Sequence, residues 1–264
     1  MIYLVGEKLN SSVPTTGEAM LARDFDKLAA LALAQAEAGA SCLDINTALC
    51  GADEIDMLRR VADLAVEKTN CDVMLDSPNP AAIIAVLPHI RGRKTIVNSV
   101  TADERLEELV PAAAEYGAGV VALPIRSGAI PSTAEGRLEN ALAIRARLNA
   151  AGIPDERIYI DALAESVAMG GDAGRTLLET TRLLRRELPD VHVICGLSNV
   201  SFGLPKRARL NAAAATLLAE AGADSFICDA ASPSLKTALA ACEAFTGKDE
   251  YCMEYITQIR SEEQ

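Results

Sequence analysis

Carboxylate and carboxamide side chains recur directly after short apolar runs in the sequence. Six runs end in this way, and the polar residues that follow them include Glu7, Asp44, Asn46, Asp76, Asn98, Asp161, Ser198 and Asn199. An Asp can accept two parallel N–H bonds, and an Asn can both donate and accept. Without paired lysines or a phosphate-binding loop beside them, such side chains suit a flat, neutral heterocycle with alternating donors and acceptors.

Two other uses of these residues are open. An Asp, Asn or Ser after a strand can simply cap the next helix. Capping favours Ser or Thr as readily as Asn, however, and does not explain a carboxamide at a strand end. Paired carboxylates could also cleave a glycosidic bond, but sugar rings usually need aromatic platforms, and only 3% of the residues are aromatic, with no Trp. The hydrogen-bonding edge of a pterin fits this composition better.

The elements that would position these side chains alternate regularly. Stretches with helical periodicity separate eight short apolar or β-branched runs, which predict strands at Ile2–Val5, Cys42–Ile45, Val73–Leu75, Thr95–Val97, Val120–Leu123, Ile158–Ile160, Val191–Cys195 and Ser225–Cys228. Gly39, Gly117 and Gly222 each follow a helical stretch and are expected to end it in a left-handed conformation.

The eight strand–helix units favour a closed barrel over a doubly wound open sheet. They average 33 residues in a chain of 264, no linker divides them, and no G-x-G-x-x-G turn is present. We therefore predict an α/β fold with one domain over residues 1–264, a (β/α)8 TIM barrel. In such barrels chemistry lies at the carboxyl ends of the strands, where the polar residues would form one mouth.

Composition argues against several other classes of protein. A net charge of −12 opposes nucleic-acid binding, which needs a basic surface. No apolar run is long enough to span a bilayer, and Met1 leads directly into the first apolar run, so we expect a cytoplasmic protein without a membrane partner. Seven Cys without a C-x-x-C pair and only two His argue against a metal centre.

Several local strings resemble the methyltetrahydrofolate:corrinoid/iron–sulfur protein methyltransferases of acetogens. The folate domain of cobalamin-dependent methionine synthase is similar to the same family. The strings run in order through nearly the whole chain: Gly6-Glu7-Lys8-Leu9-Asn10, Gly39-Ala40-Ser41-Cys42-Leu43-Asp44-Ile45-Asn46, Leu75-Asp76-Ser77-Pro78-Asn79, Ile96-Val97-Asn98-Ser99, Tyr159-Ile160-Asp161 and Gly196-Leu197-Ser198-Asn199-Val200-Ser201. The last is the most specific.

The resemblance implies a pterin-binding enzyme and a role for each matching residue. Asp76, Asn98 and Asp161 would hold the pterin edge, Gly196 and Ser198 would line the ring, and Asn199 would hydrogen-bond near N5, with Arg207 where the family has Arg. Asn199, Asp76 and Asp161 are thus the expected catalytic residues, and Glu7 and Asn46 are further substrate-binding candidates. The implied substrates are tetrahydrofolate or 5-methyltetrahydrofolate and a cobalamin carried by a separate corrinoid protein. Because related enzymes are homodimers, the resemblance also implies a homodimer.

The sequence departs from the family at two positions. Ala162 stands where Pro usually follows the strand 6 Asp, which predicts a less rigid or differently shaped loop. Phe202 matches methionine-synthase-like sequences instead of the acetogen enzymes. It suggests a different corrinoid partner, or transfer toward methyltetrahydrofolate as in O-demethylation or methylamine systems.

The remaining expectations concern residues outside these motifs and two rival functions. Cys195 is expected to be a buried strand residue and not a nucleophile, and Arg182, Arg185 and Arg186 to form a solvated helix face. The rival enzyme is a dihydropteroate synthase, whose Ser-Thr-Arg-Pro-Gly loop is absent. The rival without chemistry is a folate-binding or corrinoid-docking module.

Overall fold

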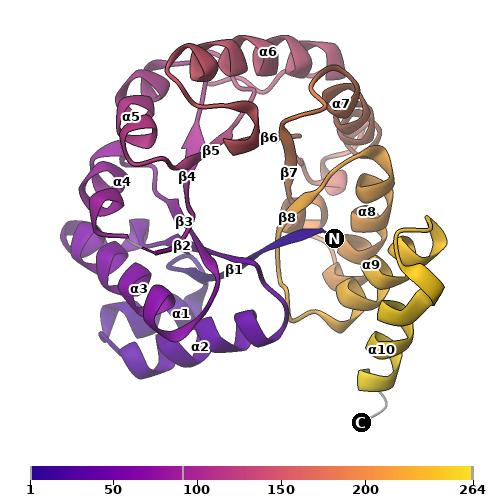
Figure 1. Ribbon diagram of the computed structural model, residues 1–264, viewed down its shortest axis with the longest axis horizontal. Coiled ribbons are helices and arrows are strands. Elements are labelled where there is room, and N and C mark those ends of the chain that lie inside the picture. The colour runs from indigo at the N-terminus through magenta and orange to yellow at the C-terminus, as the bar shows by residue number, and fades with distance from the viewer. Residues whose placement is uncertain (1, 91, 263–264) are drawn as a thin grey trace.

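Eight parallel strands close into a barrel in chain order, as the sequence predicts. The computed structural model describes residues 2–90 and 92–262, and Figure 1 shows the strands at the centre of a ring of helices. The strands are β1 (Tyr3–Asn10), β2 (Cys42–Asn46), β3 (Asp72–Asp76), β4 (Thr95–Val100), β5 (Gly119–Ala122), β6 (Ile158–Asp161), β7 (His192–Gly196) and β8 (Ser225–Cys228). The predicted (β/α)8 fold is therefore confirmed.

The helices surround the barrel and follow the strands. Their bounds are α1 (Pro14–Leu21), α2 (Phe25–Glu37), α3 (Glu54–Lys68), α4 (Pro80–Val86), α5 (Glu104–Glu115), α6 (Ala134–Ala150), α7 (Ala173–Glu187), α8 (Arg207–Ala221), α9 (Pro233–Phe245) and α10 (Met253–Glu262). Two of these helices are additional to the pattern of one helix after each strand: α1, which precedes α2, and α10, which packs outside α9 (Figure 1). Among the described residues no helix combines the length and the apolar character needed to cross a membrane.

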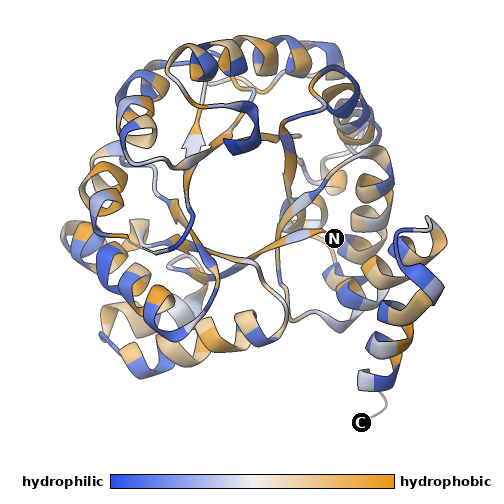
Figure 2. Ribbon diagram, viewed as in Figure 1, coloured by the Kyte–Doolittle hydropathy of each residue, from blue (hydrophilic) through white to orange (hydrophobic). Residues whose placement is uncertain are grey.

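The core has two aliphatic layers, one inside the barrel and one between the strands and the helices. The inner layer consists of buried side chains, one from each of strands β1 to β7: Val5, Cys42, Met74, Ile96, Val121, Tyr159 and Ile194. The outer layer is larger and joins the other face of every strand to the apolar stripes of the helices. Figure 2 shows this pattern, with apolar strands and helices that are polar on one side.

Strand β1 is longer than predicted. The apolar run ends at Val5, but β1 continues to Asn10, and its pairing with β2 shifts between Gly6 and Leu9. The polar residues Glu7 and Lys8 lie at this irregularity, within the strand. Glu7 is therefore part of the barrel wall and not of a loop.

Two predictions about helix ends and faces had different outcomes. Gly39, Gly117 and Gly222 all have positive φ (101°, 67° and 114°), as predicted for helix stops. The prediction that Arg185 lies on a solvated face was wrong. Its guanidinium donates to the Gly222 carbonyl at 2.9 Å and to Asp224 at 2.8 Å, and so ties α7 to the turn before β8.

Candidate active site

The register of three neighbouring strands places three of the predicted residues in one row. Asn46 at the end of β2 is paired with Asp76 of β3, and Asp76 is paired with Asn98 of β4. Parallel strands in register present such residues on the same face, here the barrel mouth. The Asn46 Nδ2 atom donates to Asp76 Oδ2 at 2.8 Å. The structure thus brings these three predicted residues together, and their role in a site stays a prediction.

Asp44 lies one pleat below this row and is almost fully buried, with 4% of its surface exposed. It accepts a long hydrogen bond of 3.4 Å from Asn98 Nδ2. Burial, and then the neighbouring Asp76, raise the pKa of Asp44 well above its ordinary value. Burial also raises the pKa of Asp76, although the hydrogen bond from Asn46 and the charge of Arg105 oppose that shift.

Asp161 ends β6 on the opposite side of the mouth from the Asn46–Asp76–Asn98 row. Burial raises the pKa of this carboxyl to about 6, against the opposing effects of the Leu163 N–H group and the Arg137 charge. The Leu163 N–H donates to Asp161 Oδ1 at 2.7 Å. Asn46 makes a similar local bond, accepting from the Ala48 N–H at 3.1 Å. Local backbone bonds therefore occupy Oδ1 of both residues. Nδ2 of Asn46 is bonded to Asp76, whereas Oδ2 of Asp161 has no protein partner in the described ranges.

Asn199 lies in a short 3-10 helix, Leu197–Ser201, that follows β7. It is exposed, and within the part of the chain that the structure describes its carboxamide has no hydrogen-bond partner. A Cβ atom at Gly196 would lie 3.0 Å from Asn199 Nδ2, so the glycine leaves room for this carboxamide. Cys195 is fully buried on the other face of the strand, as predicted, and burial raises its pKa.

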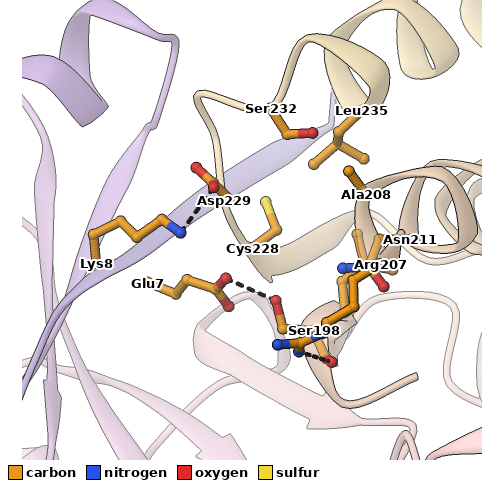
Figure 3. A pocket seen from close by; sticks show the side chains of 11 residues that line it. Glu7, Lys8, Ser198, Arg207, Ala208, Asn211, Cys228, Asp229, Ser232 and Leu235 are labelled. Atoms are coloured by element: carbon orange, nitrogen blue, oxygen red, sulfur yellow. Dashed lines mark hydrogen bonds and ion pairs between the residues drawn. The ribbon is translucent and has the colours of Figure 1, made fainter. Parts of the chain in front are cut away.

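A pocket of about 140 Å³ opens between β1, β8 and the segment that follows β7. Figure 3 shows Glu7 and Ser198 facing each other across it, with Ser198 Oγ donating to Glu7 Oε1 at 2.7 Å. Arg207 donates to the Ser198 carbonyl at 2.7 Å, and Lys8 pairs with Asp229 at 2.8 Å. The predicted residues Glu7, Ser198 and Arg207 are thus brought together, although Glu7 and Ser198 are 191 residues apart in the chain.

Sequence reasoning missed several polar residues of this region. Lys8 directly follows Glu7 in the motif, and Asp229 directly follows β8, so the position of each at the end of a strand could have identified it. Asn211 on α8 also lines the pocket, and its Oδ1 atom is buried without a hydrogen-bond partner among residues 2–90 and 92–262. Arg105 on α5 had no such signal. Its guanidinium donates to the Pro78 carbonyl at 2.6 Å and to the Ser99 carbonyl, and so joins the loop after β3 to the end of β4.

The two sides of the mouth offer different chemistry. Carboxyl and carboxamide groups of β2, β3, β4 and β6 can accept and donate along a flat polar edge. The side formed by β7, β8 and β1 contains the Asn199 carboxamide, the Lys8–Asp229 ion pair and the Arg207 guanidinium, which is bonded to the Ser198 carbonyl. In the described ranges no group of three His, Cys, Asp or Glu side chains is arranged to hold a metal ion.

The chain belongs to the pterin-binding enzymes, because the model of the family described as "Pterin binding enzyme" matches residues 7–229. It is 29% identical over 262 residues to the methylcorrinoid:tetrahydrofolate methyltransferase of Eubacterium limosum, across 98% of this chain and 96% of that protein. It is 33% identical over 241 residues to the methionine synthase of Mycobacterium tuberculosis, across 86% of this chain but only 20% of that much longer protein.

Solved structures that superpose on this chain include dihydropteroate synthases. The Yersinia pestis enzyme with a pterine–sulfa conjugate superposes with a TM-score of 0.71 at 17% identity, covering 94% of each chain. The Xanthomonas albilineans enzyme with 4-aminobenzoic acid superposes with a TM-score of 0.68 at 22% identity, covering 94% of this chain and 93% of that one. At these identities the likeness establishes the barrel fold alone.

Proposed function

We propose that this chain transfers a methyl group between N5 of tetrahydrofolate and the cobalt of a corrinoid carried by a separate protein. The observation that carries the proposal is the end-to-end similarity to a methylcorrinoid:tetrahydrofolate methyltransferase. The polar residues of the mouth support it, because Asp76, Asn98 and the buried Asp161 provide the acceptors and donors that the edge of a pterin requires. Residues 1–264 would serve as one pterin-binding methyltransferase domain.

Asn199 is the residue we propose for the reacting nitrogen. A methyl group leaves a tertiary amine poorly unless the nitrogen gains positive character, so the transition state needs a hydrogen-bonding group at N5. A carboxamide can bind N5 or its proton without adding a charge to the ground state. The Asn199 carboxamide has no partner within the described residues and lies against Gly196, which leaves it free to turn toward a ligand.

For direction, we propose transfer from the methylated corrinoid to tetrahydrofolate, as in a demethylation system. The support is the name of the Eubacterium limosum relative, which places the methylcorrinoid as donor, together with the exposed Phe202 beside the mouth. The corrinoid protein is the macromolecular substrate in either direction. The cobalt supplies the nucleophile or the methyl donor, and residues of this chain bind the pterin, orient it and hold the proton at N5.

The test is a spectral assay of methyl transfer in both directions. Methylcobalamin with tetrahydrofolate, or cob(I)alamin with methyltetrahydrofolate, should react in the presence of the protein. Asn199→Ala should lower kcat by about 100-fold or more while tetrahydrofolate still binds, because removal of one transition-state donor typically has that effect. Wild-type-like turnover by Asn199→Ala would refute the role of this residue, and binding of tetrahydrofolate without any turnover would favour a non-catalytic folate module.

Two further expectations can be tested with the same preparation. Formation of dihydropteroate from hydroxymethylpterin pyrophosphate and p-aminobenzoate would refute the methyltransferase proposal in favour of a dihydropteroate synthase. The homodimer expected from the resemblance stays a prediction, and sedimentation of the purified protein would test it.

A further inference from the structure

An arginine on α6 is buried behind the loop that follows β6. The Arg137 side chain is 1% exposed, and an arginine is almost never so buried unless its charge and all of its donors are satisfied. Its guanidinium donates to the carbonyls of Pro131 at 3.0 Å, Ala162 at 3.0 Å and Leu163 at 2.7 Å. It also pairs with Glu165 at 2.5 Å. Three of these four acceptors belong to residues 162–165.

The loop that Arg137 binds has a backbone conformation that needs support. Leu163 has a φ of 61°, a left-handed conformation that costs a residue with a Cβ atom roughly 1–2 kcal/mol. Ala162 lacks the ring with which a proline would fix its own φ. The Ala162 N–H is bonded to the Ile194 carbonyl at 3.0 Å, which anchors only the beginning of the loop.

One peptide group connects Arg137 to Asp161. The carbonyl of Ala162 and the N–H of Leu163 belong to the same planar unit. Its oxygen accepts from Arg137 Nη1 at 3.0 Å, and its N–H donates to Asp161 Oδ1 at 2.7 Å. Arg137 therefore orients this peptide plane, and the plane in turn orients the Asp161 carboxylate.

We propose that Arg137 is a positioning residue that fixes Asp161 for pterin binding through the Ala162–Leu163 peptide group. This inference rests on the proposed function, in which Asp161 binds the pterin edge. Arg137 itself lies behind the loop and does not line the mouth. Without it the peptide plane can rotate, and the carboxylate loses the restraint that holds one of its oxygens away from the ligand and directs the other toward it.

A matched pair of variants on α6 tests the role. Arg137→Met removes the guanidinium, whereas Arg145→Met removes an arginine of the same helix whose Nε donates to Asp155 at 2.9 Å, in the turn before β6. Displacement of a binding group by about 1 Å can change binding or rate about 10- to 100-fold. We expect Arg137→Met to weaken tetrahydrofolate binding by about that factor, and Arg145→Met to bind as the wild type does.

Arg137→Lys separates position from charge and keeps the test valid if the Met variant does not fold. Lysine retains the positive charge opposite Glu165, but its three donors cannot match the planar fork of arginine. The proposal therefore expects Arg137→Lys to fold and still to lose most of the affinity lost in Arg137→Met. Wild-type affinity in Arg137→Lys would overturn it.

A double-mutant cycle identifies the residue through which Arg137 acts. If the arginine positions Asp161, then Arg137→Lys should lower the tetrahydrofolate affinity of Asp161→Ala, which has no side chain to position, by less than twofold, although it lowers that of the wild type at least tenfold. Equal losses in both backgrounds would overturn the inference. Failure of the wild type to bind tetrahydrofolate would instead refute the proposed function, so the two failures can be told apart.

Discussion

Replacement of Asp161 by Asn should stabilise the folded protein at neutral pH and destroy its binding site. The carboxyl is 8% exposed, and burial raises its pKa to about 6, whereas an aspartate in an unfolded chain titrates near about 3.9. The ionised form is thus disfavoured by folding. The stability associated with this group is fully present below about pH 4 and is lost as the pH rises through about 6.

The size of the effect follows from the same two values. A difference of about 2 pKa units corresponds to about 3 kcal/mol in the free energy of unfolding. An amide at position 161 does not ionise and can still accept from the Leu163 N–H. We therefore expect Asp161→Asn to be more stable than the wild type by about 1–3 kcal/mol at pH 8 and to lose this advantage at pH 4.

Urea denaturation of both proteins at pH 4 and pH 8 measures this difference. Other buried carboxyls, such as Asp44, titrate in both proteins, so the comparison of variant with wild type isolates position 161. The same variant should bind tetrahydrofolate at least tenfold more weakly, because an amide presents one acceptor where the carboxylate presents two. A stability difference that is the same at both pH values would refute the reasoning.

Two other substitutions separate the site from the scaffold. Gly196→Ala places a Cβ 3.0 Å from Asn199 Nδ2, at a φ of −70° that alanine adopts freely. The rate of methyl transfer should therefore fall about tenfold, with the stability of the fold unchanged. The control Gly174→Ala, whose Cβ meets only ordinary contacts, should keep full activity, and equal activities of the two variants would contradict the role of Gly196. Arg185→Met removes the hydrogen bond to the Gly222 carbonyl and should lower the free energy of unfolding by about 1–3 kcal/mol. The affinity for tetrahydrofolate should stay the same, and a changed affinity would show that this residue acts on the site.

The fold could be predicted from the sequence because its signals are local. Each strand is a short apolar run, and glycine ends the helix before several of them, so strand number and order follow from periodicity alone. Strand β1 shows where that signal stops. Its second half contains the polar residues Glu7 and Lys8, so the apolar pattern does not predict a strand there. Backbone pairing with β2 nevertheless keeps this segment in the strand.

The site could be predicted only in part. Asp76, Asn98 and Asp161 could be assigned to one mouth because barrel closure brings every carboxyl end of a strand to the same rim. The partners of these residues depend on closure and loop packing instead. No sequence pattern links Ser198 to Glu7, or indicates that Arg137 binds the backbone of a loop 25 residues further along the chain.

The buried carboxyl groups at the mouth lower the stability of the fold, and they need contacts that hold them in position. Asp44 and Asp161 are buried with raised pKa values, so each lowers the stability of the ligand-free protein at neutral pH. A ligand that donates N–H bonds to an ionised carboxylate removes that disadvantage, and its affinity includes the free energy recovered. Such a gain requires the carboxylate to stay fixed before the ligand arrives, since a mobile group would relax toward water. A buried arginine that holds the adjoining peptide plane provides that fixation where a proline is absent.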